Sequence, residues 1–297
     1  MDYVEVTEHV GYVPGAVNIG VLHNDDNAVL IDTGLDKDNG RKLLRLLEEQ
    51  ELTLKAIINT HSHADHNGGN NYLTRNTEAK VYAPSIESGI IENPLLEPIY
   101  LFHGAYPIRN LHNKFVLAKP SKVDHILEPG KTEIIGLETE IVALPGHSYN
   151  QIGVLIDDVL FCADTVFSDR VIDKYRIPVV QDVARHVETL DKLEGMECRL
   201  FVPAHTKPTK DIKPLVEKNR ATTQSILEDI KGLLKEPRTT EEVQMILGNQ
   251  YGLDSDVVQQ YYLIQMTLMA YLGYLYDSKQ AEIKVEANRL RWSLLDG

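Results

Sequence analysis

The stretch INTHSHADHNGG, residues 58–69, holds three histidines and one aspartate within six positions. Residues two apart in an extended segment point the same way, so His61, His63 and Asp65 can converge, while His66 emerges from the turn that follows. Imidazole and carboxylate groups suit zinc, and also iron or manganese. Because four ligands from one short loop would be strained around a single ion, we expect other residues to complete the site.

Three further candidates each follow an apolar run that predicts a strand. His147 follows TEIVALPG, Asp164 ends VLFCAD, and His205 ends LFVPAH. Asp32 lies in LIDTG, where another such run ends. Residues at the same ends of neighbouring strands cluster in space even when they are far apart in sequence. We therefore expect His147, Asp164 and His205 to meet the cluster at residues 61–66.

The elements that must position these residues alternate between strands and helices. Residues 18–34 show two apolar runs around the polar turn NDDN, which predicts a hairpin, and RKLLRLLEEQEL at residues 41–52 has leucines at helical spacing. Short runs rich in Val and Ile, stopped by Pro or Gly, continue as strands as far as residue 205. The segment 85–122 has no clear periodicity, and we interpret it as an insertion that forms a lid or a partner surface.

After residue 207 the pattern becomes mainly helical. DIKPLVEKNRATTQSILEDIKGLLKE has helical spacing, RTTEEVQMIL begins with a capping pattern, and SDVVQQYYLIQMTLMAYLGYLYD is a long apolar helix candidate. We predict a catalytic domain at residues 1–207 and a mainly helical C-terminal region at residues 208–297. The tyrosines between residues 261 and 276 are interpreted as packing residues, because aromatic residues at helical spacing usually pack, with the lining of a substrate pocket as the alternative.

Five motifs occur in a fixed order, LIDTG, HSHADH, PGHS, CAD and PAH, and together they resemble the metallo-β-lactamase superfamily over residues 10–207. The resemblance implies an α/β fold, a four-layer αβ/βα sandwich with the site on one edge between two sheets. The helical region at residues 208–297 is then an appendage. Five ordered motifs are far more specific than any one of them.

The resemblance also implies two metal ions, with these ligands: His61, His63 and His147 for one ion, Asp65, His66 and His205 for the other, and Asp164 as a bridge. Asp32 would orient ligands through hydrogen bonds from behind them. We expect zinc, with iron or manganese as the alternatives.

Two divalent ions can hold a bridging hydroxide, because coordination lowers the pKa of water to roughly 7. We therefore predict a dinuclear metallohydrolase that acts on a small ester, thioester, lactone or phosphoester. Asp65 is the expected catalytic residue, which orients the hydroxide or passes a proton to the leaving group. The alternative is an iron-dependent oxidoreductase or dioxygenase with the same ligand set.

Some branches of the superfamily fit the sequence less well. Lactonases that open acyl-homoserine lactones commonly place Tyr three residues after the bridging aspartate, where this chain has Phe167. Diiron flavoproteins usually have Glu where this chain has His63. Glyoxalase II has a helical C-terminal region that often contributes basic residues to the substrate site, and Arg289 and Arg291 are candidates for that role, with solvated or paired arginines as the simpler interpretation.

The remaining residues of chemical interest are interpreted as structural. Cys162 is expected to be a small buried hydrophobe. Six histidines outside the motifs are assigned to the surface or to structural roles: His9, His23, His103, His112, His125 and His186.

Composition narrows the partners and the location. The 297 residues carry a net charge of −14, which disfavours broad attraction to nucleic acid or anionic lipid. Two cysteines make no disulfide framework, and no pattern of a signal peptide or membrane span is present, so we expect a cytoplasmic protein with a small-molecule substrate. The insertion and the tail offer apolar surface that would suit a homodimer.

Overall fold

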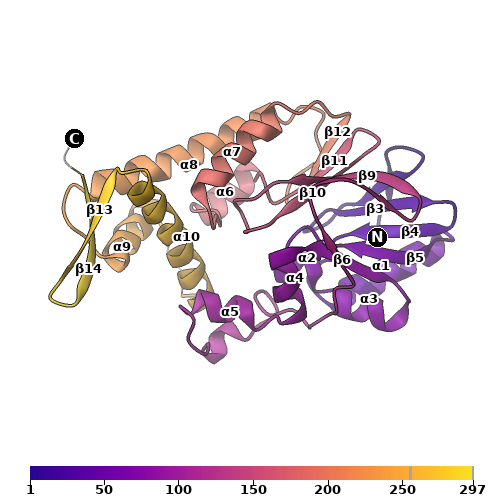
Figure 1. Ribbon diagram of the computed structural model, residues 1–297, viewed down its shortest axis with the longest axis horizontal. Coiled ribbons are helices and arrows are strands. Elements are labelled where there is room, and N and C mark those ends of the chain that lie inside the picture. The colour runs from indigo at the N-terminus through magenta and orange to yellow at the C-terminus, as the bar shows by residue number, and fades with distance from the viewer. Residues whose placement is uncertain (254–255, 296–297) are drawn as a thin grey trace.

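The computed structural model describes residues 1–253 and 256–295, and its main body is two β-sheets packed face to face with helices on both outer faces (Figure 1). A buried cluster that draws residues from both sheets fills the space between them. The predicted four-layer αβ/βα sandwich is confirmed.

The first sheet has seven strands that are hydrogen-bonded in chain order: β1 (Val4–Glu5), β2 (Val10–Val13), β3 (Ile19–Asn24), β4 (Asn27–Ile31), β5 (Thr53–Ile58), β6 (Lys80–Pro84) and β7 (His125–Leu127). Neighbours are antiparallel from β1 to β4 and parallel from β4 to β7. The register pairs Asn24 with Asn27, so Asp25 and Asp26 form the turn, and the predicted hairpin is confirmed.

The second sheet has five strands in the order β12, β11, β10, β9, β8. Their bounds are β8 (Gly130–Ile134), β9 (Leu137–Ala143), β10 (Ile152–Ile156), β11 (Val159–Ala163) and β12 (Leu200–Pro203). Strand β10 is antiparallel to both β9 and β11, and β11 is parallel to β12. Strands β9, β11 and β12 therefore run in the same direction and end at the same edge.

Alternation along the strands separates the layers of the core. Val29 and Ile31 on β4 face the second sheet, whereas Ala28 and Leu30 face outward onto helices. Helices α1 (Lys37–Glu49) and α3 (Asn70–Asn76) cover that outer face, and the leucine spacing correctly predicts α1. Helix α7 (Val183–Glu194) and the start of α8 (Lys213–Leu233) cover the second sheet.

The segment predicted as an insertion contains two short helices and one 3-10 helix. These are α4 (Ser85–Glu92), α5 (Leu96–Leu101) and η1 (Arg109–Leu111). Both α5 and η1 contact the C-terminal helix α10 (Val258–Asp277), and Figure 1 shows α10 running from the tail toward α5. His103 Nε2 lies 2.9 Å from Gln265 Oε1, and the Phe102 and Tyr262 rings meet edge to face. The insertion and the tail thus cover part of each other, and the expected homodimer stays a prediction.

The tail continues from α8 into α9 (Thr240–Tyr251) and α10. Thr239 and Glu242 form the capping box that the sequence predicts at the start of α9. Tyr271 is buried in the cluster that joins these helices, so packing is confirmed for that tyrosine, whereas Tyr261 and Tyr276 are exposed. No described helix has the length and apolar character needed to cross a membrane.

The chain ends in a hairpin that the sequence analysis did not predict, made of β13 (Ala281–Glu286) and β14 (Arg289–Leu294). Arg289 and Arg291 lie on β14, at the far end of the tail from both sheets (Figure 1). The division at residue 207 stays a prediction. The tail cluster also takes Val180 and Val183 from before that boundary.

Candidate metal centre

The residues predicted to bind metal follow strands whose carboxyl ends meet at one edge of the sandwich. Asp32 directly follows β4, and the loop from His61 to His66 comes after the parallel neighbour β5. In the second sheet, His147, Asp164 and His205 come after β9, β11 and β12, which run in one direction. Parallel strands carry their loops to the same edge, and this is why residues so distant in sequence meet.

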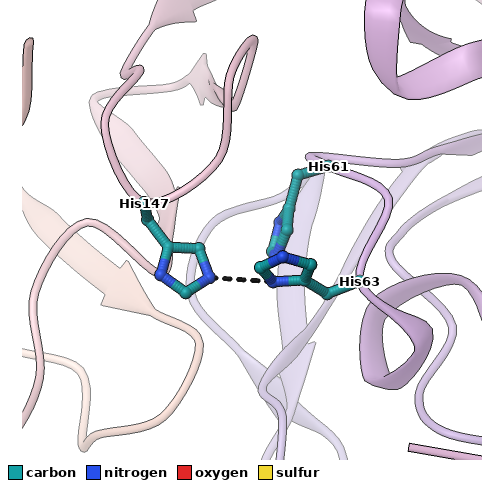
Figure 2. A group of neighbouring side chains, drawn as sticks. All are labelled: His61, His63 and His147. Atoms are coloured by element: carbon teal, nitrogen blue, oxygen red, sulfur yellow. Dashed lines mark hydrogen bonds between the residues drawn. The ribbon is translucent and has the colours of Figure 1, made fainter. Parts of the chain in front are cut away.

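The structure brings all seven predicted ligands together, and their ligand-type atoms fall into overlapping groups. His61, His63 and His147 form one trio, shown in Figure 2, in which His63 Nδ1 lies 2.9 Å from His147 Nε2. Three further residues form a second trio: Asp65, His66 and His205. Within each group the ligand atoms lie within 4.8 Å of one another.

The carboxylate of Asp164 lies between the two trios. Its Oδ1 is 3.4 Å from His66 Nε2, and its Oδ2 is 3.4 Å from His147 Nε2 and 3.2 Å from His205 Nε2. One oxygen therefore faces the second trio while the other is shared by both. This placement suits the bridging role that the resemblance implies for Asp164.

Four of the imidazole rings make an outward hydrogen bond through Nδ1. Nδ1 of His147 donates to the Val179 carbonyl at 2.9 Å, and Nδ1 of His205 donates to the Ala16 carbonyl at 2.7 Å. The rings of His61 and His66 use Thr60 Oγ1 at 3.0 Å and Asp32 Oδ2 at 2.8 Å in the same way. With the proton held on Nδ1, the inward Nε2 of a neutral ring carries a lone pair, which is the form that binds a metal.

Some polar atoms at the centre of the site have no hydrogen-bond partner in the described part of the chain, and they indicate whether these residues fit metal ions. Nε2 of His61, Nε2 of His66 and Oδ1 of Asp164 are buried without a hydrogen-bond partner among the described residues. Buried polar atoms are nearly always satisfied, because leaving one unpaired costs about 1–3 kcal/mol. Lone pairs from imidazole and carboxylate that converge in this way fit a divalent cation, so the residues fit the two ions that the resemblance implies.

Charges inside the site divide the histidines into two classes. Burial lowers the pKa of His61 and His63 and lowers that of His147 to about 4, so these rings are neutral near pH 7. Burial opposes charge on His66 and His205 as well, but nearby carboxylates outweigh it and raise their pKa to about 10 and about 12. Asp164 is the strongest of these carboxylates for both rings. In the absence of metal, His66 and His205 are therefore protonated, and their positive charge interacts favourably with the nearby carboxylates.

Asp32 holds the first loop from behind. Its Oδ1 accepts a hydrogen bond from the Thr60 amide at 2.8 Å, and its Oδ2 accepts from the Thr60 hydroxyl and from His66 Nδ1, both at 2.8 Å. Thr60 in turn accepts from His61, so one carboxylate acts on a ring of each trio. These contacts match the orienting role that the resemblance implies for Asp32.

Gly146 explains the turn that presents His147. Its φ is +129°, and an added Cβ would lie 2.5 Å from the backbone of His186 at the start of α7. Its carbonyl accepts hydrogen bonds from the Gln181 and Asp182 amides. A side chain at this position would push α7 away from the PGHS loop, so the glycine is required for close packing.

Two residues that support this site were not predicted from the sequence. Gln151 joins two motif loops, because its Nε2 donates to the Leu144 carbonyl at 3.0 Å and its Oε1 accepts from the Asp164 amide at 3.3 Å. Glu87 lies on α4, in the segment without periodicity, and accepts hydrogen bonds from both the HSHADH and PGHS loops. Neither residue belongs to a motif, and a single polar residue carries no periodic signal that would have identified it.

The residues that sequence analysis set aside lie where a structural role would place them. Cys162 is buried in the cluster beneath α7, as expected for a small hydrophobe. His186 is buried beside the PGHS loop rather than exposed. The six histidines outside the motifs belong to none of the ligand clusters found in the described part of the chain.

The sequence of this chain matches a known protein family. The family model described as "Metallo-beta-lactamase superfamily" matches residues 12–205. That range contains all five motifs.

Curated relatives match part of the chain. This chain is 30% identical over 151 residues to a hydroxyacylglutathione hydrolase of Photobacterium profundum, and the match covers 50% of this chain and 47% of the relative. A protein of the same name from Shewanella loihica is 30% identical over 173 residues, covering 58% and 55%. The chain thus spans about half the length of the curated relatives it matches.

Solved structures match nearly the whole chain. A metallo-beta-lactamase family protein from Thermus thermophilus has a TM-score of 0.72 at 21% identity and covers 97% of this chain and 98% of its own. A beta-lactamase domain protein from Burkholderia ambifaria has a TM-score of 0.75 at 19% identity, with 99% and 94% covered. At this identity the likeness concerns the fold.

Proposed function

Because the chain belongs to the metallo-beta-lactamase superfamily over residues 12–205, we propose that it is a dinuclear metal-dependent hydrolase of a small thioester. The observation that carries the proposal is the convergence of three buried atoms without a hydrogen-bond partner among the described residues, on His61, His66 and Asp164. Relatives named hydroxyacylglutathione hydrolase favour a thioester over the ester, lactone and phosphoester that the same ligands would also serve.

The proposal assigns two zinc ions to the two trios, with Asp164 between them. The neutral rings of His61, His63 and His147 suit one ion without any loss of protons, because their pKa values lie below neutral. The second ion has to displace protons from His66 and His205, whose pKa values are raised. When bound, such ions lower the pKa of coordinated water to roughly 7 and polarise the carbonyl under attack.

Asp65 is assigned to proton transfer. Nearby His66 and His205 outweigh the effect of burial and hold its pKa well below the usual range, so the carboxylate is ionised at neutral pH in the metal-free site. Its contacts to His66 and His205 use Oδ2, which leaves Oδ1 as the atom assigned to the transferred proton. Hydrolysis of a thioester adds the oxygen of water to the acyl carbon and breaks the carbon–sulfur bond. The thiolate that leaves is the group to which Asp65 returns the proton.

A phenyl ring borders His147 at the site. The Phe167 ring lies 5.6 Å from the His147 ring, centroid to centroid, and is almost completely buried. A phenyl group has no hydroxyl with which to bind a carbonyl oxygen, so this position separates the chain from lactonases that use a tyrosine there. It also excludes water from one side of the ligands, which strengthens electrostatic interactions within the site.

Selectivity is assigned to the insertion together with the tail. The Tyr100 hydroxyl on α5 lies 3.5 Å from Gln181 Nε2, and the Gln181 amide donates to Gly146 in the PGHS loop. Helix α5 therefore borders the loop that carries His147, and α10 packs behind α5. This arrangement favours α5 and α10 as the elements that contact the acyl and thiol parts of the substrate.

A substrate panel tests the proposal. Metal-stripped protein is reconstituted with zinc and assayed on a hydroxyacylglutathione, a lactone, a phosphodiester and a β-lactam. We expect the thioester to be hydrolysed with the highest kcat/KM and all activity to vanish with the chelator. Preference for another substrate would reject the thioester, and bound iron with oxygen uptake in protein purified without added metal would favour the oxidoreductase.

A further inference from the structure

Glu87 is a buried carboxylate that lies outside every motif. It lies in the first turns of α4, where its side chain is 1% exposed. A buried carboxylate is costly unless hydrogen bonds replace the water it has lost. The position of its partners therefore indicates what the residue does.

Both oxygens of Glu87 are engaged, and each accepts from a different loop. Oε2 accepts from the Ser62 amide at 3.0 Å and from the Ser62 hydroxyl at 2.5 Å. Oε1 accepts from the Ser148 hydroxyl at 2.8 Å and from the Asn150 amide at 3.0 Å. One carboxylate thus joins the loop after β5 in the first sheet to the loop after β9 in the second.

These loops carry the first trio. Ser62 lies between His61 and His63, and Ser148 directly follows His147. The two loops come from opposite sheets, and one backbone hydrogen bond joins their inner ends, from the Ile152 amide to the Thr60 carbonyl at 3.0 Å. The Glu87 bridge is a second link, nearer the ligand rings in sequence, and it accompanies the 2.9 Å approach of His63 Nδ1 to His147 Nε2.

We propose that Glu87 is a positioning residue that sets the separation of the two loops and thereby the metal affinity of the trio His61, His63 and His147. This inference rests on the proposed function, because it presupposes a metal at that trio. The second trio is held by different partners, since Asp32 holds His66 and the Ala16 carbonyl holds His205. Loss of the Glu87 carboxylate is therefore expected to affect one ion more than the other.

The substitution E87Q removes the charge of Glu87 and one of its two acceptor atoms, and it keeps the volume of the side chain. Glutamine has nearly the same shape, but only one of its two terminal atoms accepts from a backbone amide. A serine hydroxyl can rotate to accept from the new NH2 group, whereas the Ser62 or Asn150 amide at that end loses its acceptor. E87Q thus releases one loop while the other stays held. S148A is a milder variant, because it keeps the Asn150 bond and removes one hydroxyl.

The experiment titrates zinc into the metal-stripped full chain against a chromogenic chelator. The wild type is expected to bind two equivalents. In E87Q one equivalent is expected to bind about 10–100-fold more weakly, the range typical of losing a residue that orients ligands, while the other changes less than threefold. S148A is expected to weaken the same equivalent by a smaller factor. Cobalt titration gives a second readout, since the visible spectrum of the weakened equivalent should change in E87Q.

Two controls separate positioning from a general loss of stability. E92Q makes the same chemical change at an exposed position of the same helix, and it should bind both equivalents as the wild type does. V243A removes buried volume in α9, far along the chain from the site, and should lower the melting temperature without weakening one equivalent selectively.

The outcomes distinguish this inference from the proposed function. If the wild type binds two equivalents and E87Q and S148A bind both with unchanged affinity, or lose both equally, Glu87 does not position the trio and only this inference fails. If the wild type binds no metal, the proposed function and this inference are both overturned. Should E87Q fail to fold, S148A alone decides the question by the same criterion.

Discussion

Oδ2 of Asp32 lies 2.8 Å from Nδ1 of His66, and both side chains are buried. The contact joins the end of β4 to the HSHADH loop and fixes which nitrogen of His66 faces the centre. The same carboxylate also accepts two hydrogen bonds from Thr60, which fix its position. Asp32 thereby sets the orientation of the His66 ring, which the proposal assigns to the second ion.

Replacing Asp32 with asparagine should weaken the binding of that second ion. The amide has one acceptor atom, so it cannot serve both the Thr60 amide and the His66 ring. We expect about 10–100-fold weaker zinc binding in one of two equivalents, measured by chelator competition. D26N, in the exposed turn between β3 and β4, is the matched control. Wild-type affinity in D32N would show that the contact does not orient a ligand.

Replacing Asp65 with asparagine tests its catalytic role apart from binding. The amide oxygen can still act as a ligand, but the side chain no longer accepts a proton at neutral pH. We expect kcat for thioester hydrolysis to fall about 10²–10⁴-fold in samples with two metals bound. Metal content and kcat have to be measured on the same preparation, and a fully loaded D65N with normal kcat would assign the proton to another group.

The buried His186 ring should make the metal-free protein less stable in acid. Burial lowers its pKa from 6.5 to about 4, so between these values the unfolded chain binds a proton that the folded chain excludes. Stability is therefore retained above pH 6.5 and lost as the pH falls toward 4. Between pH 7 and pH 5 the free energy of unfolding of the wild type should fall by about 2 kcal/mol more than that of H186Q.

Urea unfolding at each pH provides that measurement. H125Q is the control, because it removes a solvent-exposed ring on β7 and should leave the wild-type pH dependence in place. Equal pH dependence in the wild type and H186Q would mean that the buried ring takes up its proton without cost.

Trp292 should be the main anchor of the C-terminal hairpin. Its ring is 4% exposed, its Nε1 donates to Thr240 Oγ1 at 3.1 Å, and its backbone pairs with Arg238. W292A should lower the free energy of unfolding by about 3–5 kcal/mol, measured by circular dichroism in denaturant. R289A, on the exposed part of the same strand, should change it by less than about 0.5 kcal/mol. A loss below about 1 kcal/mol in W292A would show that the hairpin contributes little to stability.

Much of the fold could be predicted because it depends on local patterns. The apolar run at residues 28–31 predicts a strand, and the polar NDDN turn predicts its hairpin. The final hairpin was missed because its contacts are few. Trp292 and Ala281 are its fully buried members, and two buried residues among many exposed ones leave no clear period in the sequence.

The sequence by itself determined which side chains are candidate metal ligands, because residue type and spacing set the ligand chemistry and the strand ends at which these side chains lie. Only the tertiary structure decided how they are held. Asp164 lies between two trios, Glu87 joins loops from opposite sheets, and His186 is buried against Gly146. Each of these contacts joins segments far apart in the chain. Their geometry depends on the packing of the two sheets, and no local pattern encodes that packing.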